Sequence, residues 1–144
     1  MKKIMLIGSI GAGKTTLTQA LKNEIIEYKK TQSIEFDDYI IDTPGEYIDN
    51  KVYYNALVVT SADADVIGLV QDSTDETSSF PPSFGNMFNK EVIGICTKID
   101  LCESEENLKR SEEFLSSAGA QYVFGVSAIN NEKIEELKKY LDFD

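Results

Sequence analysis

Four residues near the amino terminus, Gly8, Gly13, Lys14 and Thr15, have the types and the spacing of the phosphate-binding motif G-x-x-x-x-G-K-[S/T]. Glycines at these positions let the backbone wrap closely, so that its amides point at phosphate oxygens. Lys14 is able to reach the β- and γ-phosphates of a nucleotide, and the Thr15 hydroxyl is a suitable ligand for Mg²⁺. The predicted phosphate-binding residues are Gly8, Ser9, Ile10, Gly11, Ala12, Gly13, Lys14, Thr15 and Thr16.

A second motif, DTPG, follows a short apolar run that ends at Asp42. A carboxylate at the end of a strand is able to hold Mg²⁺ through a water. The Gly45 amide is then placed to contact a γ-phosphate and to swing away after hydrolysis. An ordinary Pro-Gly turn is the alternative, but the complete phosphate motif upstream favours the functional interpretation. We therefore predict catalytic roles for Lys14 and Gly45.

A third stretch, TKID at 97–100, has the residues to read a nucleobase. Asp100 is able to accept both N1–H and the exocyclic amine of guanine, a paired contact that adenine does not return. The stem of Lys98 is long enough to lie over the base plane. Further along, Ser127 and Ala128 follow another apolar run, and a backbone amide there is placed to meet guanine O6. The alternative for TKID is a charged strand end before a helix. The predicted base-site residues are Thr97, Lys98, Asp100, Ser127 and Ala128.

Regular elements must bring these motifs to one place. Apolar runs of strand type occur at 3–7, 65–71, 91–98 and 121–126, and a short hairpin is predicted from Ser33 to Asp42. Helical periodicity occurs at 13–28, 104–119 and 130–141. The apolar faces of the first and last helices are predicted to comprise Leu17, Leu21, Ile25, Ile134, Leu137 and Leu141.

Strand and helix alternate along the whole chain, which predicts an α/β fold with a mostly parallel sheet of five or six strands and helices on both faces. Without a linker or an internal repeat, residues 1–144 are predicted to form a single domain. In such sheets ligands bind beyond the carboxyl ends of the strands, where all three motifs are predicted to lie.

Composition narrows the function. A formal net charge of -11 argues against nucleic acid as a partner and against anionic membrane surfaces. The chain has no histidine, which removes Ser-His-Asp and Cys-His catalysis and every His-based metal site. Its two cysteines lack C-x-x-C spacing and are expected to be reduced thiols. The first eight residues fit a strand better than a signal peptide, and no run is long enough for membrane insertion.

In their order along the chain, GSIGAGKT, DTPG, TKID and SA resemble the motifs of the Ras-like superfamily of small GTPases, with Thr97 in place of the commoner asparagine. The combination IDTPGEY, PPSF and VIGICTKID is similar, more narrowly, to the EutP/PduV family of ethanolamine- and propanediol-utilisation proteins. The resemblance implies a compact P-loop NTPase fold with a short first switch, which binds Mg²⁺ and GTP or GDP, with ATP possible. It also implies a bacterial cytoplasmic protein linked to microcompartment metabolism.

The same resemblance completes the predicted metal site. In the superfamily, a threonine of the first switch joins Mg²⁺, and Thr31 is the best-placed residue for this role. The alternative is that Thr31 is an ordinary loop residue. The predicted metal ligands are Thr15, Thr31 and Asp42.

Three features predict slow hydrolysis. Glu46 follows the Gly45 position, where related proteins often have a neutral amide that orients the attacking water. It is interpreted as a surface residue, as a base toward an acceptor, or as a sign that hydrolysis depends on a partner. Arg110, the single arginine, is expected to be a solvated residue on a helix and no arginine finger. Ile10 is bulky where the superfamily has a small residue.

Three classes of function remain open at this stage. The first is a guanine-nucleotide switch with weak GTPase activity. The second is a P-loop, ATP-dependent phosphotransferase of the same metabolism, a small-metabolite or acyl-phosphate kinase, although such kinases usually close an arginine-rich lid over the phosphates. The third is a protein that only binds partners, against which the intact Lys14 and Thr15 count.

The stretch SSFPPSFGNMF, from Ser78 to Phe88, combines two prolines with three phenylalanines. One interpretation is that Phe80, Phe84 and Phe88 pack a long loop onto the domain. The other is that they form a docking surface for a microcompartment protein or for a second copy of the chain.

Overall fold

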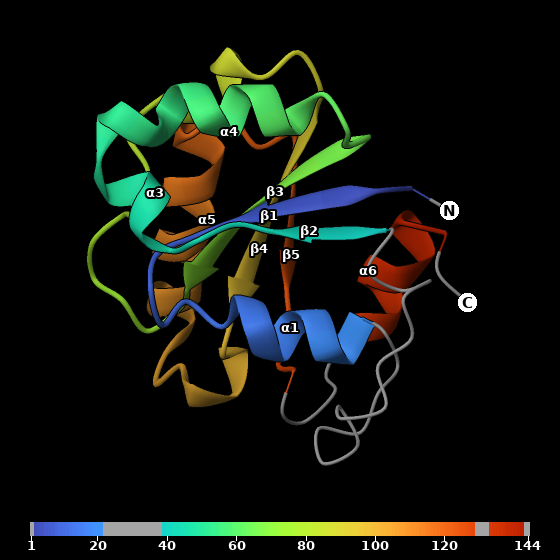
Figure 1. Cartoon of the computed structure of the whole chain (residues 1–144). Coiled ribbons are helices and arrows are strands. Elements are labelled where there is room, and N and C mark those ends of the chain that lie inside the picture. Colours follow the sequence, from blue (N-terminus) through green and yellow to red (C-terminus); the bar gives the residue numbers. More distant parts are fainter. Residues whose placement is uncertain (1, 22–38, 129–132, 143–144) are drawn as a thin grey trace.

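The computed structural model describes residues 2–21, 39–128 and 133–142. Its centre is a sheet of five parallel strands, in the order β2-β1-β3-β4-β5 (Figure 1). The α/β fold predicted from the alternation of strands and helices is confirmed. The strands are β1 (Ile4–Ile7), β2 (Ile40–Asp42), β3 (Val66–Asp72), β4 (Glu91–Thr97) and β5 (Tyr122–Gly125).

The central strands are apolar on both sides because helices cover both faces of the sheet. Along β1, Ile4 and Leu6 point into one core cluster, whereas Met5 and Ile7 point into the other. All four side chains are essentially inaccessible to solvent. This alternation follows from the two-residue period of a strand. The phosphate motif therefore starts from the best-buried strand of the sheet.

Helices form a layer on each face (Figure 1). One face carries α1 (Lys14–Leu21) and α6 (Ile134–Tyr140), which pack against β1, β3 and β4 through their predicted apolar faces. The other face carries α3 (Glu46–Asp49), α4 (Tyr54–Ser61) and α5 (Glu105–Ser117). None of the helices in the described part of the chain combines the length and apolarity that a membrane span requires. Short 3-10 turns occur at Lys51–Tyr53, Phe84–Met87 and Ile99–Leu101.

The ends of α5 lie where the sequence predicts them. The Ser104 side chain accepts a hydrogen bond from the Asn107 backbone N–H at 3.4 Å, as an N-cap does. Beyond the last turn, Gly119 has φ of +108°, a conformation that stops a helix and suits glycine.

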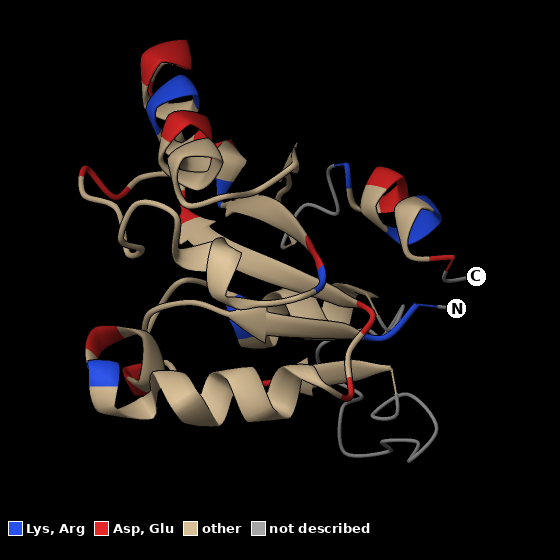
Figure 2. Ribbon diagram, turned by 90° about the horizontal axis from the view of Figure 1, so that it is seen from above, with Lys and Arg blue, Asp and Glu red and all other residues tan. Residues whose placement is uncertain are grey.

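The α3–α4 segment was not predicted. The helix α4, YNALVVTS, has three β-branched residues, no charge and no side-chain cap, so it lacks the usual signals of a helix. Figure 2 shows the absence of charge along α4, next to the acidic residues of α3. Its stability must come from packing, because Leu57 is buried against the sheet.

The predicted hairpin from Ser33 to Asp42 lies mostly outside the described residues, as do Ile25 and Thr31. Its described end forms β2, which pairs in parallel with β1, Leu6 facing Asp42. This register places Asp42 at the edge of the sheet from which the phosphate loop leaves.

The segment from Ser73 to Phe88 is anchored to the domain, and we call it the β3–β4 segment. Phe80, Phe84 and Phe88 are at most 5% exposed and contact one another ring to ring. Backbone N–H groups of this segment also donate to the last carbonyls of α5, from Ser83 to Ser117 and from Gly85 to Ala118. The packing interpretation of the phenylalanines is confirmed, and the prediction of a docking surface built on their side chains is wrong because those side chains are buried.

Candidate functional site

The phosphate loop joins the end of β1 to the start of α1. Gly11 and Gly13 have φ of +84° and +99°, which L side chains rarely adopt. Gly8 is needed for a different reason, since a Cβ there would lie 2.7 Å from the Val70 carbonyl oxygen. The loop therefore follows a path that these glycines alone permit, directly before the amino end of a helix.

Lys14, at the start of α1, is buried and donates a hydrogen bond from Nζ to the Gly8 carbonyl at 2.8 Å. Burial lowers its pKa, while the nearby Asp42 carboxylate opposes that change. Partial desolvation by its neighbours in turn raises the pKa of Asp42, against the effect of the Lys14 cation and of a backbone hydrogen bond at Thr43. The two predicted catalytic and metal-binding groups are thus close enough to interact through their charges.

The carboxyl end of β4 holds the second half of the phosphate loop. The Thr97 hydroxyl lies 2.6 Å from the Ala12 carbonyl oxygen and donates to it. Lys98 donates from Nζ to the Gly11 carbonyl at 2.9 Å and to Asp72 Oδ2 at 2.9 Å. The contacts from Thr97 to Ala12 and from Lys98 to Gly11 bridge more than eighty positions in the chain, and they bring the TKID motif against the phosphate motif.

Asp72 is the last residue of β3, and its carboxylate orients the Lys98 side chain. Burial acts to raise the pKa of Asp72, but hydrogen bonds from Lys98 and Thr74 outweigh it and leave that pKa below its ordinary value. The group is consequently a carboxylate at neutral pH. Its ion pair directs the Lys98 side chain across the mouth of the phosphate loop.

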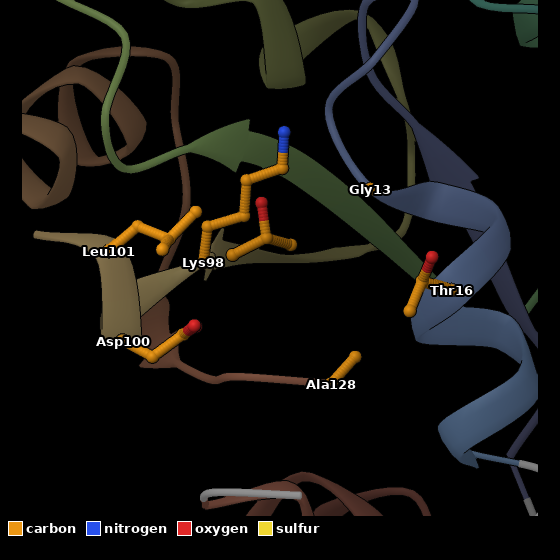
Figure 3. A pocket seen from close by; sticks show the side chains of 7 residues that line it. Gly13, Thr16, Lys98, Asp100, Leu101 and Ala128 are labelled. Carbon is orange, nitrogen blue, oxygen red and sulfur yellow. The ribbon is translucent and has the colours of Figure 1, made fainter. Parts of the chain in front are cut away.

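Two adjoining hollows lie at this edge of the sheet. The first is open, has a volume of about 320 Å³ and is the natural place for phosphates; its lining comprises Gly11, Gly13, Lys14, Thr15, Thr16 and Lys98. The second is the candidate base pocket shown in Figure 3; its lining comprises Gly13, Thr16, Thr97, Lys98, Asp100, Leu101 and Ala128. Three segments far apart in the sequence therefore meet in one pocket.

Within the base pocket, Asp100 belongs to the 3-10 turn after β4, and Ala128 follows β5 (Figure 3). Asp100 is exposed, so its carboxylate is accessible to a ligand. Leu101 is 59% exposed and adds an apolar wall that the sequence did not predict as part of the site. Ser127 is buried beside Ala128 and does not line the pocket with its side chain.

The loop that carries DTPG, residues 42–45, is called the sensor loop, and it touches the first half of the phosphate loop. A Cβ on Gly45 would lie 2.7 Å from the Ile10 backbone nitrogen and 2.9 Å from its Cα, so this approach requires glycine. The Thr43 hydroxyl attaches this loop to β1 by donating to the Leu6 carbonyl at 2.8 Å. Ile10 remains 77% exposed, and Glu46 is exposed at the start of α3.

Arg110 differs from its prediction as a solvated surface residue. It is half-buried on α5, and its Nε atom is buried with no hydrogen-bond partner. The residue lines neither hollow. The described site therefore contains no arginine.

The predicted Mg²⁺ ligands can be compared with the described residues. Thr15 lines the phosphate hollow, and Asp42 is exposed at the end of β2 and interacts with Lys14. No group of three or more His, Cys, Asp or Glu residues is close enough to hold a metal within the described part of the chain. One hydroxyl and one carboxylate beside a phosphate hollow fit Mg²⁺, which usually completes its shell with phosphate oxygens and water.

Two contacts of the site escaped sequence reasoning. Ser9 donates from Oγ to Ser79 Oγ at 2.6 Å, across seventy positions of the chain. Gln71, inaccessible to solvent near the end of β3, holds the segment that carries Ser79. The one available signal was a glutamine in an otherwise apolar strand, since a buried amide requires hydrogen-bond partners.

Comparison with known families agrees with this geometry. A family model described as "Ethanolamine utilisation - propanediol utilisation", PduV-EutP, matches residues 1–143. The chain belongs to this family. It is 43% identical to the propanediol utilization protein PduV of Citrobacter freundii, over 99% of this chain and 94% of that one. It is also 33% identical to a protein of Escherichia coli named "Probable acetate kinase EutP", over 98% of this chain and 89% of the other.

Solved structures show the same fold. The G-domain of FeoB from Methanococcus jannaschii superposes with a TM-score of 0.62 at 22% identity, covering 98% of this chain and 95% of that domain. An Era variant from Aquifex aeolicus, bound to GDP and AlF4-, gives a TM-score of 0.66 at 22% identity, over 99% of this chain and 57% of Era. The predicted P-loop GTPase type of fold is confirmed.

Proposed function

We propose that this PduV–EutP protein binds guanine nucleotides with Mg²⁺ and acts as a slow GTPase switch in ethanolamine or propanediol utilisation. The observation that carries the proposal is that hydrogen bonds join the TKID motif to the phosphate loop. Thr97 and Lys98 of TKID bond to carbonyls of the phosphate loop, while Asp100 lines the pocket beside it. This arrangement supports a single site in which the phosphates and the base of one nucleotide bind side by side.

Each group of the site has a defined task in this proposal. The loop amides and the amino end of α1 bind the β-phosphate, and Lys14 leaves its contact with the Gly8 carbonyl to reach phosphate oxygens. Thr15 and Asp42 hold Mg²⁺, and Thr31 is the proposed third ligand from the protein. The metal ion supplies positive charge that offsets the charge developing on the phosphates. Gly45 senses the γ-phosphate through its backbone amide.

Asp100 is the proposed reader of the base. A carboxylate that accepts two hydrogen bonds from guanine meets no such donor pair on adenine. The Lys98 stem and Leu101 supply apolar walls for the ring. Replacing Asp100 with Asn should weaken GTP binding by about tenfold or more, and should shift preference toward xanthine nucleotides.

Slow turnover follows from the same site. Glu46 is exposed and carries no amide for orienting water, and Arg110 is half-buried on α5, outside both hollows. Ile10 projects beside the sensor loop, where it would obstruct an arginine supplied by a partner.

Direct binding measurements test the proposal. GTP, GDP, ATP and ADP are titrated with Mg²⁺ into the purified protein, and GTP is expected to bind at least tenfold more tightly than ATP. Lys14→Ala should weaken triphosphate binding by about 100-fold without unfolding the protein, because it removes a cation that contacts phosphate. The matched control is Lys109→Ala, at an exposed position of α5. Normal nucleotide binding by Lys14→Ala would refute the site.

A second candidate function is suggested by the curated relatives. Proteins of Escherichia coli and Salmonella typhimurium named "Probable acetate kinase EutP" are 33% and 32% identical to this chain. A phosphotransferase would pass the γ-phosphate to acetate rather than to water, forming acetyl phosphate. Trapping of acetyl phosphate with hydroxylamine, with ATP and with GTP as donors, distinguishes the two candidates. Equal binding of ATP and GTP with acetate-dependent turnover would favour the kinase.

The cellular setting is part of the same proposal. A bacterial cytoplasmic location and an association with a microcompartment are inferred from the metabolism for which the family is named.

A role limited to partner binding is the remaining alternative function. Nucleotide binding in the titration above would exclude it.

A further inference from the structure

The first half of the phosphate loop, Ser9 and Ile10, is held by two different segments. Ser9 Oγ lies 2.6 Å from Ser79 Oγ in the β3–β4 segment. Ile10 packs through its backbone against Gly45 of the sensor loop. The second half of the loop, Gly11 and Ala12, is held separately by Lys98 and Thr97. The two halves can therefore respond to different substitutions.

Ser79 is in turn fixed from the core. Its backbone N–H donates to Gln71 Oε1 at 3.1 Å, and Gln71 Nε2 donates to the Thr77 carbonyl at 3.0 Å. Gln71 is completely buried, and Phe80, the residue after Ser79, is only 4% exposed. A serine held on both sides in this way presents its hydroxyl at a defined place, so little entropy is lost when it bonds to Ser9.

The half of the loop that Ser79 holds is the half that lies against the sensor loop. Gly45, the proposed γ-phosphate sensor, contacts Ile10, next to Ser9. The phosphate hollow nearer α1, by contrast, is lined by Gly11 and Gly13 onward. A shift of Ser9 should consequently disturb the third phosphate more than the first two.

We propose that Ser79 is a positioning residue for the phosphate loop, acting through Ser9 to favour a nucleoside triphosphate over a diphosphate. This role rests on the proposed nucleotide-binding function and adds to it a specificity determinant in the β3–β4 segment. Ser79 touches no nucleotide itself. Its hydroxyl sets the path of Ser9 and Ile10 beneath the sensor loop.

The test compares affinities for a non-hydrolysable GTP analogue and for GDP, both with Mg²⁺, in the full-length protein. Ser79→Ala should weaken the triphosphate analogue about three- to tenfold and leave GDP within about twofold, since one neutral hydrogen bond is removed. Ser9→Ala should have the same effect, and the double variant should be no worse than either single variant. Ser79→Thr retains the hydroxyl and should restore the wild-type affinity ratio.

The control is Ser78→Ala, whose hydroxyl bonds within its own segment to Phe80 and not to the phosphate loop. It should leave the ratio unchanged. Melting temperatures of all variants are measured without nucleotide to detect any loss of stability. A purely structural role would weaken the binding of both ligands equally. An unchanged ratio in Ser79→Ala, or additive effects of the two serines, would overturn the inference. Absence of any nucleotide binding by the wild-type protein would instead refute the proposed function.

Discussion

Two segments flank the phosphate loop, and they are built in opposite ways. The β3–β4 segment, which carries Ser79, is anchored by three buried phenylalanines and by bonds to the last turn of α5. The sensor segment, from the end of β2 through α4, meets the loop at Gly45. It buries Ile48 and Leu57 but leaves other apolar side chains exposed. Val52 and Val59 are 72% and 67% exposed. Both segments contact adjacent residues of the same loop.

The difference indicates that the two segments have different roles toward the phosphate loop. Burial of aromatic side chains stabilises a segment in one arrangement, whereas a segment that leaves part of its apolar surface exposed opens at a smaller free-energy cost. The β3–β4 segment is therefore suited to hold one half of the loop in place, and the sensor segment is suited to move when the occupant of the site changes. Five substitutions, described in four predictions, examine this contrast.

The largest effect is expected at Phe84, which contacts Phe80, Phe88 and Tyr54 of α4. Phe84→Ala should lower the free energy of unfolding by about 3–5 kcal/mol, because it leaves a cavity in the packed core. Urea denaturation measures this change. A loss below about 1 kcal/mol would show that the β3–β4 segment is not anchored as described.

The next effect is expected at Gly45, where α3 begins. Gly45→Ala places a Cβ against backbone atoms of Ile10, so either the sensor loop shifts or stability falls by about 1–3 kcal/mol. Its backbone conformation, φ of -61°, is accessible to alanine, so the effect is steric. Triphosphate affinity should fall while GDP affinity remains, as isothermal titration would show. Equal weakening of both ligands would contradict a sensor role.

A smaller, pH-dependent effect is expected at Asp72, whose carboxylate pairs with Lys98. The pKa of Asp72 is lower in the folded protein than its ordinary value, so its ionised form stabilises the fold above the unfolded pKa. That stabilisation is lost as the pH falls through the folded-state pKa. Asp72→Asn should therefore cost about 0.5–1 kcal/mol at pH 7, and the difference from the wild type should shrink toward pH 2. A difference that does not depend on pH would exclude the ion pair as its cause.

The smallest effect is expected at two exposed valines, Val59 of α4 and Val52 of the 3-10 turn before it. Val59→Ser and Val52→Ser should each change the free energy of unfolding by no more than about 0.5 kcal/mol, since little apolar area is buried there. They are the counterparts of Phe84→Ala in the other segment, and thermal denaturation is sufficient to compare them. A loss similar to that at Phe84 would remove the contrast between the two segments.

The sequence predicts the part of the site that is encoded locally. The phosphate motif, the strand ends at Asp42 and Thr97, and the Ser104 cap each depend on residues within a few positions, and the structure places them as expected. The same is true of the sheet, because apolar runs alternate with helical periodicity.

Other features depend on residues far apart in the sequence. The Ser9–Ser79 bond and the Lys98–Asp72 pair join different loops, and no periodicity connects their members. The helix α4 was missed because its stability depends on tertiary packing rather than on propensity or caps. Arg110 was misjudged for a similar reason, since burial of its Nε depends on what packs against α5 and not on its neighbours in the chain.

The bonds from Ser83 and Gly85 to the final carbonyls of α5 also bear on protein engineering. The β3–β4 segment supplies the last turn of α5 with partners for groups that a helix end leaves unpaired. A chimera that exchanged only the exposed tip of this segment would keep those partners. An exchange of the whole segment would have to include the end of α5. The β3–β4 segment and the end of α5 must therefore be exchanged together in any chimera.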